Sequence, residues 1–267
     1  MKKKSKDESY QVLGIESSCD DTAASVVKIT NFTDNKKIEI LSSIVLNQNS
    51  LHSEFKGVVP EIAARAHSQR IDICTKEALK NANISIEDIN LICVTSGPGL
   101  IGGLLSGVMF AKGLAKGLNK PIVGVNHLAA HCFSVKMIHN LDCPYLTLLV
   151  SGGHCQFLIV KGVDSFYRLG GTIDDAPGEC FDKIASFLGI GYPGGPIIET
   201  RSKKGNEERF DFPKPIYDST FNMSFSGLKT AVKRETENLI KKQGGLYQKD
   251  IDDICASFQK TATEIFK

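Results

Sequence analysis

The sequence predicts an α/β fold built from two related lobes. Two β-rich hairpins lie far apart in the chain: segments 10–15 and 23–29 flank a polar turn, and segments 145–150 and 156–160 flank a glycine turn. Between the hairpins, strand-like segments alternate with helical ones, which is typical of an α/β architecture. We therefore expect the two lobes to face each other, with the functional site in the cleft between them.

The individual elements follow from the residue pattern. Strands are expected at 91–95 and 122–125, and a helix is expected to begin at Pro60, because proline suits the first turn of a helix. The segment 104–118 has apolar residues at helical spacing and few polar ones elsewhere, so we expect this helix to be buried between layers. Further helices are indicated at 181–188 and 251–265.

This pattern predicts the domain organisation. We expect a flexible N-terminus at 1–9, an N-terminal lobe at 10–125 and a C-terminal lobe at 126–267. The last helix is still periodic at Lys267 and has no C-cap signal, which is weak support for a missing portion.

Composition restricts the class of protein. The chain of 267 residues has 42% hydrophobic and 23% charged residues, close to the average for soluble globular proteins. Its net charge of +2 gives no global attraction to a polyanion, so nucleic-acid binding is neither indicated nor excluded. The eight cysteines include no C-x-x-C pair, and we find no signal peptide and no apolar run near the ~20 residues of a membrane span. We expect a cytoplasmic protein.

The strongest local signal for chemistry is a pair of histidines. His127 and His131 are spaced i, i+4, which places both imidazoles on one helix face within reach of one metal ion. Two unrelated histidines at a helix end are an alternative of about equal weight. Leu128 stands where the H-E-x-x-H proteases need a glutamate base, so that class of protease is disfavoured.

Glycine-rich loops and carboxylates give weaker signals. The segment 97–102 matches G-x-G-x-x-G, but the acidic residue expected about 20 positions later is missing, so tight packing has equal weight with phosphate binding. The Ser151–Gly153 turn offers backbone N–H groups to an anion, although an ordinary turn explains it too. Glu179 and Asp182 are expected on one helix face, where a carboxylate would accept bonds from sugar hydroxyls. Acidic residues also simply favour a first helical turn.

Taken together, these segments are similar to one family. The similarity is carried, in the same order along the chain, by residues 14–22, 57–65, 95–100, 126–131, 149–154, 174–183, 192–196 and 225–230. They resemble the tRNA N6-adenosine threonylcarbamoyltransferase (TsaD) family, and His154 after the glycine pair resembles its bacterial and mitochondrial branch.

The resemblance implies an actin-like, Hsp70-like (ASKHA) fold and a defined reaction. The threonylcarbamoyl group would pass from threonylcarbamoyl-AMP to N6 of adenosine 37 in tRNA. One divalent metal ion, Fe²⁺ in preference to Zn²⁺, would be held by His127 and His131. The catalytic candidates are Glu16 and Ser151. The residues implied to hold the adenylate substrate are Leu149, Val150, Ser151, Gly152, Gly153, Asp182 and Gly195.

The resemblance also implies partners and one departure. The expected partners are tRNA, a paralogous protein of the same fold and a small ATPase, with no membrane. Family members continue past this point with a glycine-rich segment and an aspartate that is a third metal ligand, so we expect the second lobe to be incomplete. The alternatives are an ATPase or kinase of the same fold, and a catalytically incomplete scaffold that binds the paralogous partner.

Overall fold

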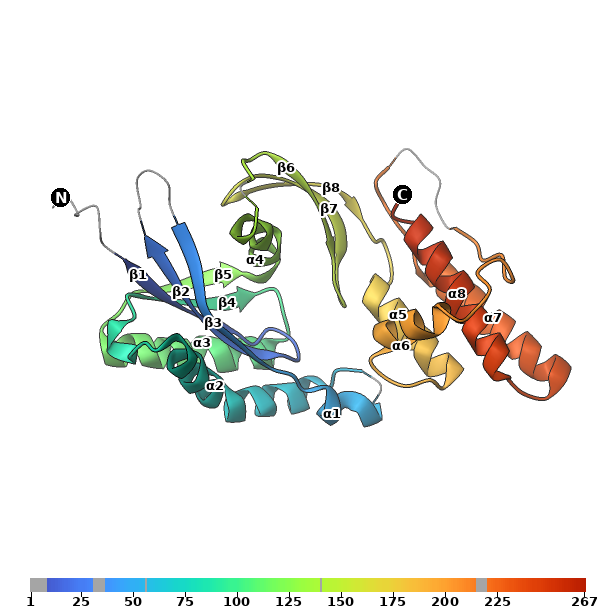
Figure 1. Ribbon diagram of the computed structural model, residues 1–267, viewed down its shortest axis with the longest axis horizontal. Coiled ribbons are helices and arrows are strands. Elements are labelled where there is room, and N and C mark those ends of the chain that lie inside the picture. Colours follow the sequence, from blue (N-terminus) through green and yellow to red (C-terminus); the bar gives the residue numbers. More distant parts are fainter. Residues whose placement is uncertain (1–8, 31–36, 56, 140, 215–219) are drawn as a thin grey trace. The chain divides into compact units, whose positions relative to one another are not determined.

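The computed structural model describes residues 9–30, 37–55, 57–139, 141–214 and 220–267. Nearly all of the predicted flexible N-terminus, residues 1–8, lies outside these ranges. The chain forms two compact units, Met1–Asn140 and Leu141–Lys267, and each contains a hydrophobic core of its own. Figure 1 shows the elements of each unit.

The first unit is built on a mixed five-stranded sheet in the order β3-β2-β1-β4-β5. Its strands are β1 (Tyr10–Glu16), β2 (Thr22–Thr30), β3 (Lys37–Leu46), β4 (Leu91–Gly97) and β5 (Ile122–Asn126). Strands β1, β2 and β3 are antiparallel neighbours, whereas β4 runs parallel to both β1 and β5. The predicted first hairpin is therefore confirmed, and its polar turn follows Glu16 at the end of β1.

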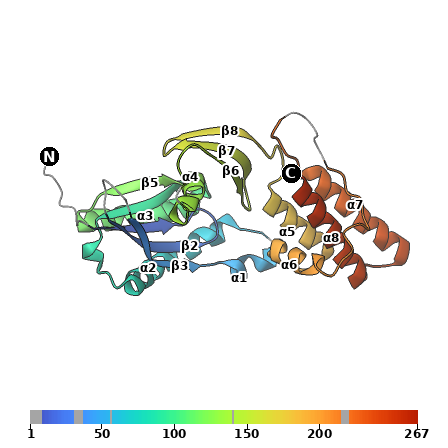
Figure 2. The same ribbon diagram turned by 45° about the horizontal axis from the view of Figure 1, so that its top comes forward.

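The helices of this unit are α1 (Asn49–His52), α2 (Pro60–Ala82), α3 (Ile101–Leu118) and α4 (His127–Ser134), with short 3₁₀ turns at Ser53–Phe55, Ile86–Asp88 and Val135–Met137. Helices α2 and α3 pack against one face of the sheet, and α4 lies on the other (Figure 2). Proline at the first position of α2 confirms the expected helix start. The core between sheet and helices includes Leu13, Ile15, Ile71 and Ile92.

Helix α3 differs from its prediction. It buries Leu104, Ala111 and Ala115, but Ile101 is 73% exposed and Met109 is 61% exposed. The helix is therefore buried on one face only, because the sheet and α2 contact one side of it. By length and composition it is the one helix in the described part of the chain that would be able to cross a membrane, a test that core helices also pass.

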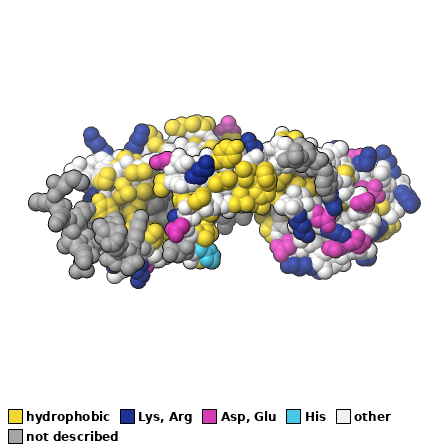
Figure 3. Space-filling model, turned by 90° about the horizontal axis from the view of Figure 1, so that it is seen from above, with side chains coloured by type: hydrophobic (Ala, Val, Ile, Leu, Met, Phe, Trp, Pro, Cys, Tyr) yellow, Lys and Arg dark blue, Asp and Glu magenta, His cyan; other side chains and the backbone are white. Residues whose placement is uncertain are grey.

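The second unit starts with a three-stranded antiparallel sheet in the order β6-β7-β8. Its elements are β6 (Tyr145–Val150), β7 (Cys155–Gly162), β8 (Ser165–Gly171), α5 (Pro177–Leu188), α6 (Gly194–Ser202), α7 (Ser226–Gln243) and α8 (Gln248–Glu264). The core of this unit is dominated by Phe225, Phe258, Ile184, Leu228 and Ile254, all fully buried. Some hydrophobic side chains remain exposed, among them those of Leu146 and Leu148 on β6, and the face in Figure 3 shows such groups beside charged ones.

Both units begin with the same motif, a meander of three antiparallel strands. In the first unit the meander continues into the parallel strands β4 and β5, whereas the described residues of the second unit contain the meander alone. The predicted α/β class is confirmed. The repeated meander agrees with the two-lobed actin-like fold that the resemblance implies.

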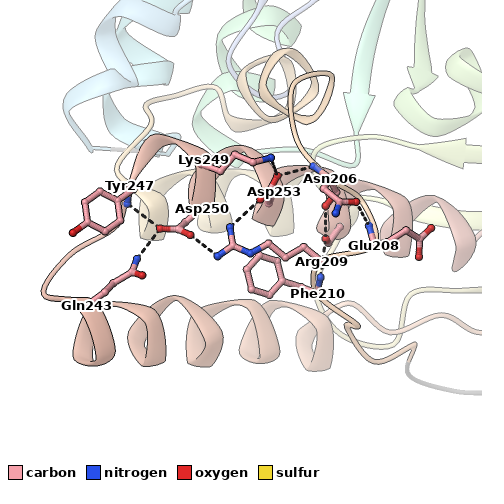
Figure 4. A network of polar contacts seen from close by, with 10 residues as sticks. Asn206, Glu208, Arg209, Phe210, Gln243, Tyr247, Lys249, Asp250 and Asp253 are labelled. Atoms are coloured by element: carbon pink, nitrogen blue, oxygen red, sulfur yellow. Dashed lines mark hydrogen bonds and ion pairs between the residues drawn. The ribbon is translucent and has the colours of Figure 1, made fainter.

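A polar network ties the segment before residue 210 to α8 in the second unit (Figure 4). The Arg209 guanidinium donates to Asp250 at 2.6 Å and to Asp253 at 2.8 Å. Asp253 also accepts from the backbone N–H of Asn206 at 2.6 Å and from Lys249 at 2.9 Å. Burial of Asp253 opposes its ionisation, but these donors outweigh it and lower the pKa of the carboxyl to about 2.

Candidate functional site

The Glu16 carboxylate is the centre of the polar cluster in the first unit. Glu16 ends β1 beside the parallel strand β4, so it lies next to Thr95, whose hydroxyl donates to Oε2. The backbone N–H of Ser18 donates to Oε1 at 2.5 Å, and Nδ1 of His127 lies 3.2 Å from Oε2. Burial of the carboxylate opposes ionisation, but the hydrogen bonds from His127, Ser18 and Thr95 outweigh it and lower the pKa of Glu16 to about 2.

His127 and His131 come together as their spacing predicts. His127 is the first residue of α4, a helix capped by the Asn126 side chain, which accepts from Ala129 N at 3.0 Å. The two imidazole centroids are 4.6 Å apart and the ring planes are nearly perpendicular. An ionised Glu16 only accepts hydrogen bonds, so Nδ1 of His127 donates, and in the neutral imidazole Nε2 then carries the lone pair.

The two imidazoles are donors that suit a transition metal, and they supply part of a ligand set. A metal-bound histidine usually donates its other ring N–H to a carboxylate or carbonyl, which is the contact that Glu16 makes. Within the described ranges no third His, Cys, Asp or Glu joins the pair to form a group of three. The residues present therefore fit two positions of a metal site.

The G-x-G-x-x-G segment supports the turn after Glu16. Gly99 of this segment lies against Ser18, and Gly103, directly after the segment, lies against Ser17. A Cβ on Gly99 would come within 2.5 Å of the Ser18 carbonyl oxygen. Leu100 N donates to Ser18 O at 2.7 Å, and the Ser17 hydroxyl donates to Gly103 O at 2.9 Å. These contacts favour the packing interpretation of the segment over phosphate binding.

A cavity of about 260 Å³ borders Glu16 in the same unit. All five strands of the sheet and α4 line it, mostly with small side chains. The lining residues are Gly14, Ile15, Glu16, Ala23, Ala24, Ser25, Ser43, Cys93, Val94, Thr95, Val125 and Ala130. Glu16 is the one charged group among them. Open space therefore lies directly beside the polar cluster.

In the second unit, the tip of the β6-β7 hairpin packs against α5. Ser151 N donates to His154 O at 2.8 Å, and the Ser151 hydroxyl accepts from His154 N at 3.1 Å, which closes the turn. Gly152 O accepts from Glu179 N at 3.2 Å, in the first turn of α5. The adenylate-binding candidates Leu149 to Gly153 are thus placed at the start of this helix.

The other two adenylate-binding candidates are Asp182, further along α5, and Gly195, in the first turn of α6. Asp182 Oδ1 accepts from the backbone N–H of Gly194 at 2.7 Å, where α6 begins. Gly195 follows, with no atom within 4 Å of the position that a Cβ would occupy. Glu179, expected to act together with Asp182, instead pairs with Lys183 at 2.5 Å. Helix α5 therefore connects the hairpin tip with Asp182 and Gly195.

Comparison with known proteins decides the family. A family model described as tRNA N6-adenosine threonylcarbamoyltransferase matches residues 39–267. An enzyme of that name from Cereibacter sphaeroides is 56% identical over 254 residues, which is 95% of this chain and 69% of the relative. The enzyme of the same name from Paracoccus denitrificans is 55% identical over 254 residues, again 95% of this chain and 69% of the relative. This chain belongs to the tRNA N6-adenosine threonylcarbamoyltransferase family.

The similarity of this chain to solved structures is lower. A Ppx/GppA family member from Aquifex aeolicus covers 97% of this chain and 91% of its own, with 10% identity and a TM-score of 0.42. This value is too low to support an argument, so the threonylcarbamoyltransferase assignment depends on the sequence matches.

Two segments that carry the family resemblance are joined in the structure, a contact that sequence reasoning missed. Asp174 accepts from the backbone N–H groups of Phe225 and Ser226 at 2.8 and 3.3 Å, at the start of α7. Its neighbour Asp175 pairs with Lys229. The adjacent aspartates therefore anchor the first turn of α7. They lie 51 to 54 positions before these partners, a separation that leaves no periodic signal in the sequence.

Proposed function

We propose that this chain transfers the threonylcarbamoyl group from threonylcarbamoyl-AMP to N6 of adenosine 37 in tRNA. Membership of the threonylcarbamoyltransferase family supports the reaction. The observation that carries the site is the contact of Glu16 with Nδ1 of His127, because it leaves the other ring nitrogen for a metal ion.

The proposed metal ligands in this chain are Nε2 of His127 and the imidazole of His131. A divalent ion bound there, Fe²⁺ in preference to Zn²⁺, would act as a Lewis acid on a substrate oxygen. The described residues provide no third ligand to the pair. We propose that a third ligand would come from outside the described residues.

The roles of the other candidates follow from their contacts. A pKa of about 2 makes Glu16 a poor general base at neutral pH, so its proposed role is to orient His127. The backbone N–H of Ser151 closes the turn with His154 O, so the N–H groups of its neighbours Gly152 and Gly153 would steady developing negative charge. Leu149, Val150, Asp182 and Gly195 would hold the adenylate, since all are in or beside the segments connected through α5.

The proposed setting is the bacterial type of the pathway. The chain would act on tRNA in the cytoplasm together with a paralogous partner of the same fold and a small ATPase. Two basic side chains of α6 and its C-terminal end are already paired within the chain, because Arg201 contacts Asp252 at 2.9 Å and Lys203 contacts Glu199 at 3.0 Å.

Nucleoside analysis by mass spectrometry tests this proposal. Unmodified tRNA is incubated with the chain, its partners, threonine, bicarbonate and ATP, and threonylcarbamoyladenosine is the expected product. The double variant H127A/H131A is the matched control and should give none. Steady phosphate release without tRNA would instead identify an ATPase or kinase, and partner binding without product would identify a scaffold.

A further inference from the structure

A buried chain of side chains links the start of α2 to the turn that carries Glu16. Gln48, His52 and His67 are each 0% exposed. His52 Nδ1 lies 3.3 Å from the backbone N–H of Val59, and His52 Nε2 lies 3.2 Å from Gln48 Oε1. Gln48 Nε2 lies 3.5 Å from His67 Nδ1, and His67 Nε2 lies 3.0 Å from the carbonyl oxygen of Cys19.

The groups at the two ends of this network, the Val59 N–H and the Cys19 carbonyl, fix the direction of every hydrogen bond in it. The N–H of Val59 only donates, so His52 accepts at Nδ1 and donates from Nε2 to the Gln48 oxygen. The Gln48 amide then donates toward His67 Nδ1. The carbonyl of Cys19 only accepts, so His67 donates to it from Nε2. Each member therefore has one hydrogen-bonding arrangement, which makes the network rigid.

His67 is the member that contacts the turn. Besides the Cys19 carbonyl, it contacts Thr22, whose hydroxyl is 2.8 Å from Nδ1. It therefore holds both the middle and the end of the turn that follows Glu16. Ser18, inside the same turn, contacts Glu16 through its backbone N–H and lies 3.2 Å from His127 Nδ1 through its hydroxyl.

We propose that His67 is a positioning residue for the metal site, acting through the turn on Glu16 and His127. This role gives the segment around Pro60 a function, since Val59 at the start of α2 fixes the far end of the network. The inference rests on the proposed function for the metal itself, but the geometry that it explains exists without a metal.

Two substitutions of similar size separate the hydrogen bond from mere burial. In H67Q the amide nitrogen reaches the position of Nε2 and keeps the bond to Cys19. In H67N the shorter amide reaches only the position of Nδ1 and loses that bond. We expect H67N to weaken Co²⁺ binding at the histidine pair about 10–100-fold, as loss of outer-shell support does. H67Q should keep the Co²⁺ affinity of the parent, because the bond to the Cys19 carbonyl is retained.

A readout without metal makes the two proposals distinguishable. Long-range ¹H–¹⁵N NMR of the full chain reports the His127 tautomer, which should be Nδ1–H in the parent and in H67Q, and mixed in H67N. If the parent binds no Co²⁺, the metal proposal fails and the tautomer alone decides the role of His67. Thr75 is buried on the same helix and donates to the Ile71 carbonyl, so T75V is the control. Compared with a His67 variant that loses as much stability, T75V should leave both Co²⁺ binding and the His127 tautomer unchanged.

An unchanged His127 tautomer in H67N would overturn the inference. So would an equal loss in H67Q and H67N, or the same change in T75V, because each would show that burial and not the bond to Cys19 is what matters.

Discussion

At the residue scale, the metal proposal depends on which ring nitrogen of His127 is free. The ionised Glu16 accepts three hydrogen bonds, and Nδ1 of His127 supplies one of them. In the neutral ring the lone pair of Nε2 is then the one available to a metal ion, and the centroid of the His131 ring lies 4.6 Å from that of His127. A carboxylate in this position both orients the imidazole and makes it a better ligand.

Replacing both histidines tests this arrangement directly. H127A/H131A should lose bound metal completely in elemental analysis of the purified chain, because both nitrogen ligands are removed. H139A is the control, since His139 is an exposed histidine of the same unit outside the pair. Metal content that is unchanged in the double variant would refute the assignment.

Sequence spacing predicted the histidine pair, because positions i and i+4 share a helix face. It did not predict the contact of Glu16 with His127, since the two are 111 positions apart. That contact results from the parallel pairing of β1 with β4 and of β4 with β5, which brings three strand ends together. Tertiary pairing of this kind leaves no periodic signal in one sequence.

At the scale of elements, helix α3 supports the turn after Glu16 through its glycines. The backbone of the helix approaches Ser17 closely at Gly103, where a Cβ would also come within 3.2 Å of the His67 ring. Gly113 lies on the same helix with no atom within 4 Å of its Cβ position. Gly103 is therefore a position where close packing requires glycine, whereas at Gly113 glycine only weakens the helix.

Alanine at these two positions should change stability in opposite directions. G103A should destabilise the chain by about 1–3 kcal/mol, because the added methyl overpacks the contact with Ser17. G113A should stabilise it by about 0.5–1 kcal/mol, because alanine favours the helix. Urea unfolding measures both, and equal effects of the two changes would show that the packing at Gly103 is not tight.

The Arg209 network should make the second unit sensitive to acid. The pKa of Asp253 is about 2 in the folded chain, below its ordinary value of 3.8. A carboxyl whose pKa is lower in the folded chain than in the unfolded chain stabilises the fold at pH values above its ordinary pKa. This contribution to stability is lost as the pH falls from about 4 toward 2. D253N should lower stability at pH 7 and flatten this acid-dependent loss in unfolding experiments across the pH range.

The exposed pair of Asp72 with Lys76 gives the control for this experiment. D72N should leave the acid-dependent loss in place, because an exposed pair on one helix contributes little. An acid profile of D253N identical to that of the parent would contradict the assignment of the effect to Asp253.

Two strands that the sequence did not predict, β8 and β3, have little burial pattern where they begin. Strand β8 is exposed over its first four residues, and β3 over its first four, so neither shows the alternation that marks a half-buried strand. Both are held by pairing with the middle strand of a meander instead. The hairpins β1-β2 and β6-β7, which alternate or are strongly apolar, were predicted correctly.

At the scale of the whole molecule, the two hydrophobic cores share no residue. One core is formed around Ile92 and the strands of the first unit, and the other around Phe258 and the helices of the second. Units with separate cores are expected to unfold as separate cooperative blocks, so a single free energy of unfolding would not describe this chain.

Core substitutions test this separation. F258A should cost about 3–5 kcal/mol and I92A about 2–5 kcal/mol, because each leaves a cavity in a fully packed core. In calorimetry we expect two transitions, with F258A lowering one and I92A lowering the other. The histidine pair belongs to the first unit and the adenylate-binding candidates to the second, so F258A should leave Co²⁺ binding intact while weakening binding of an adenylate. One shared transition, lowered equally by both substitutions, would show instead that the units fold as a single block.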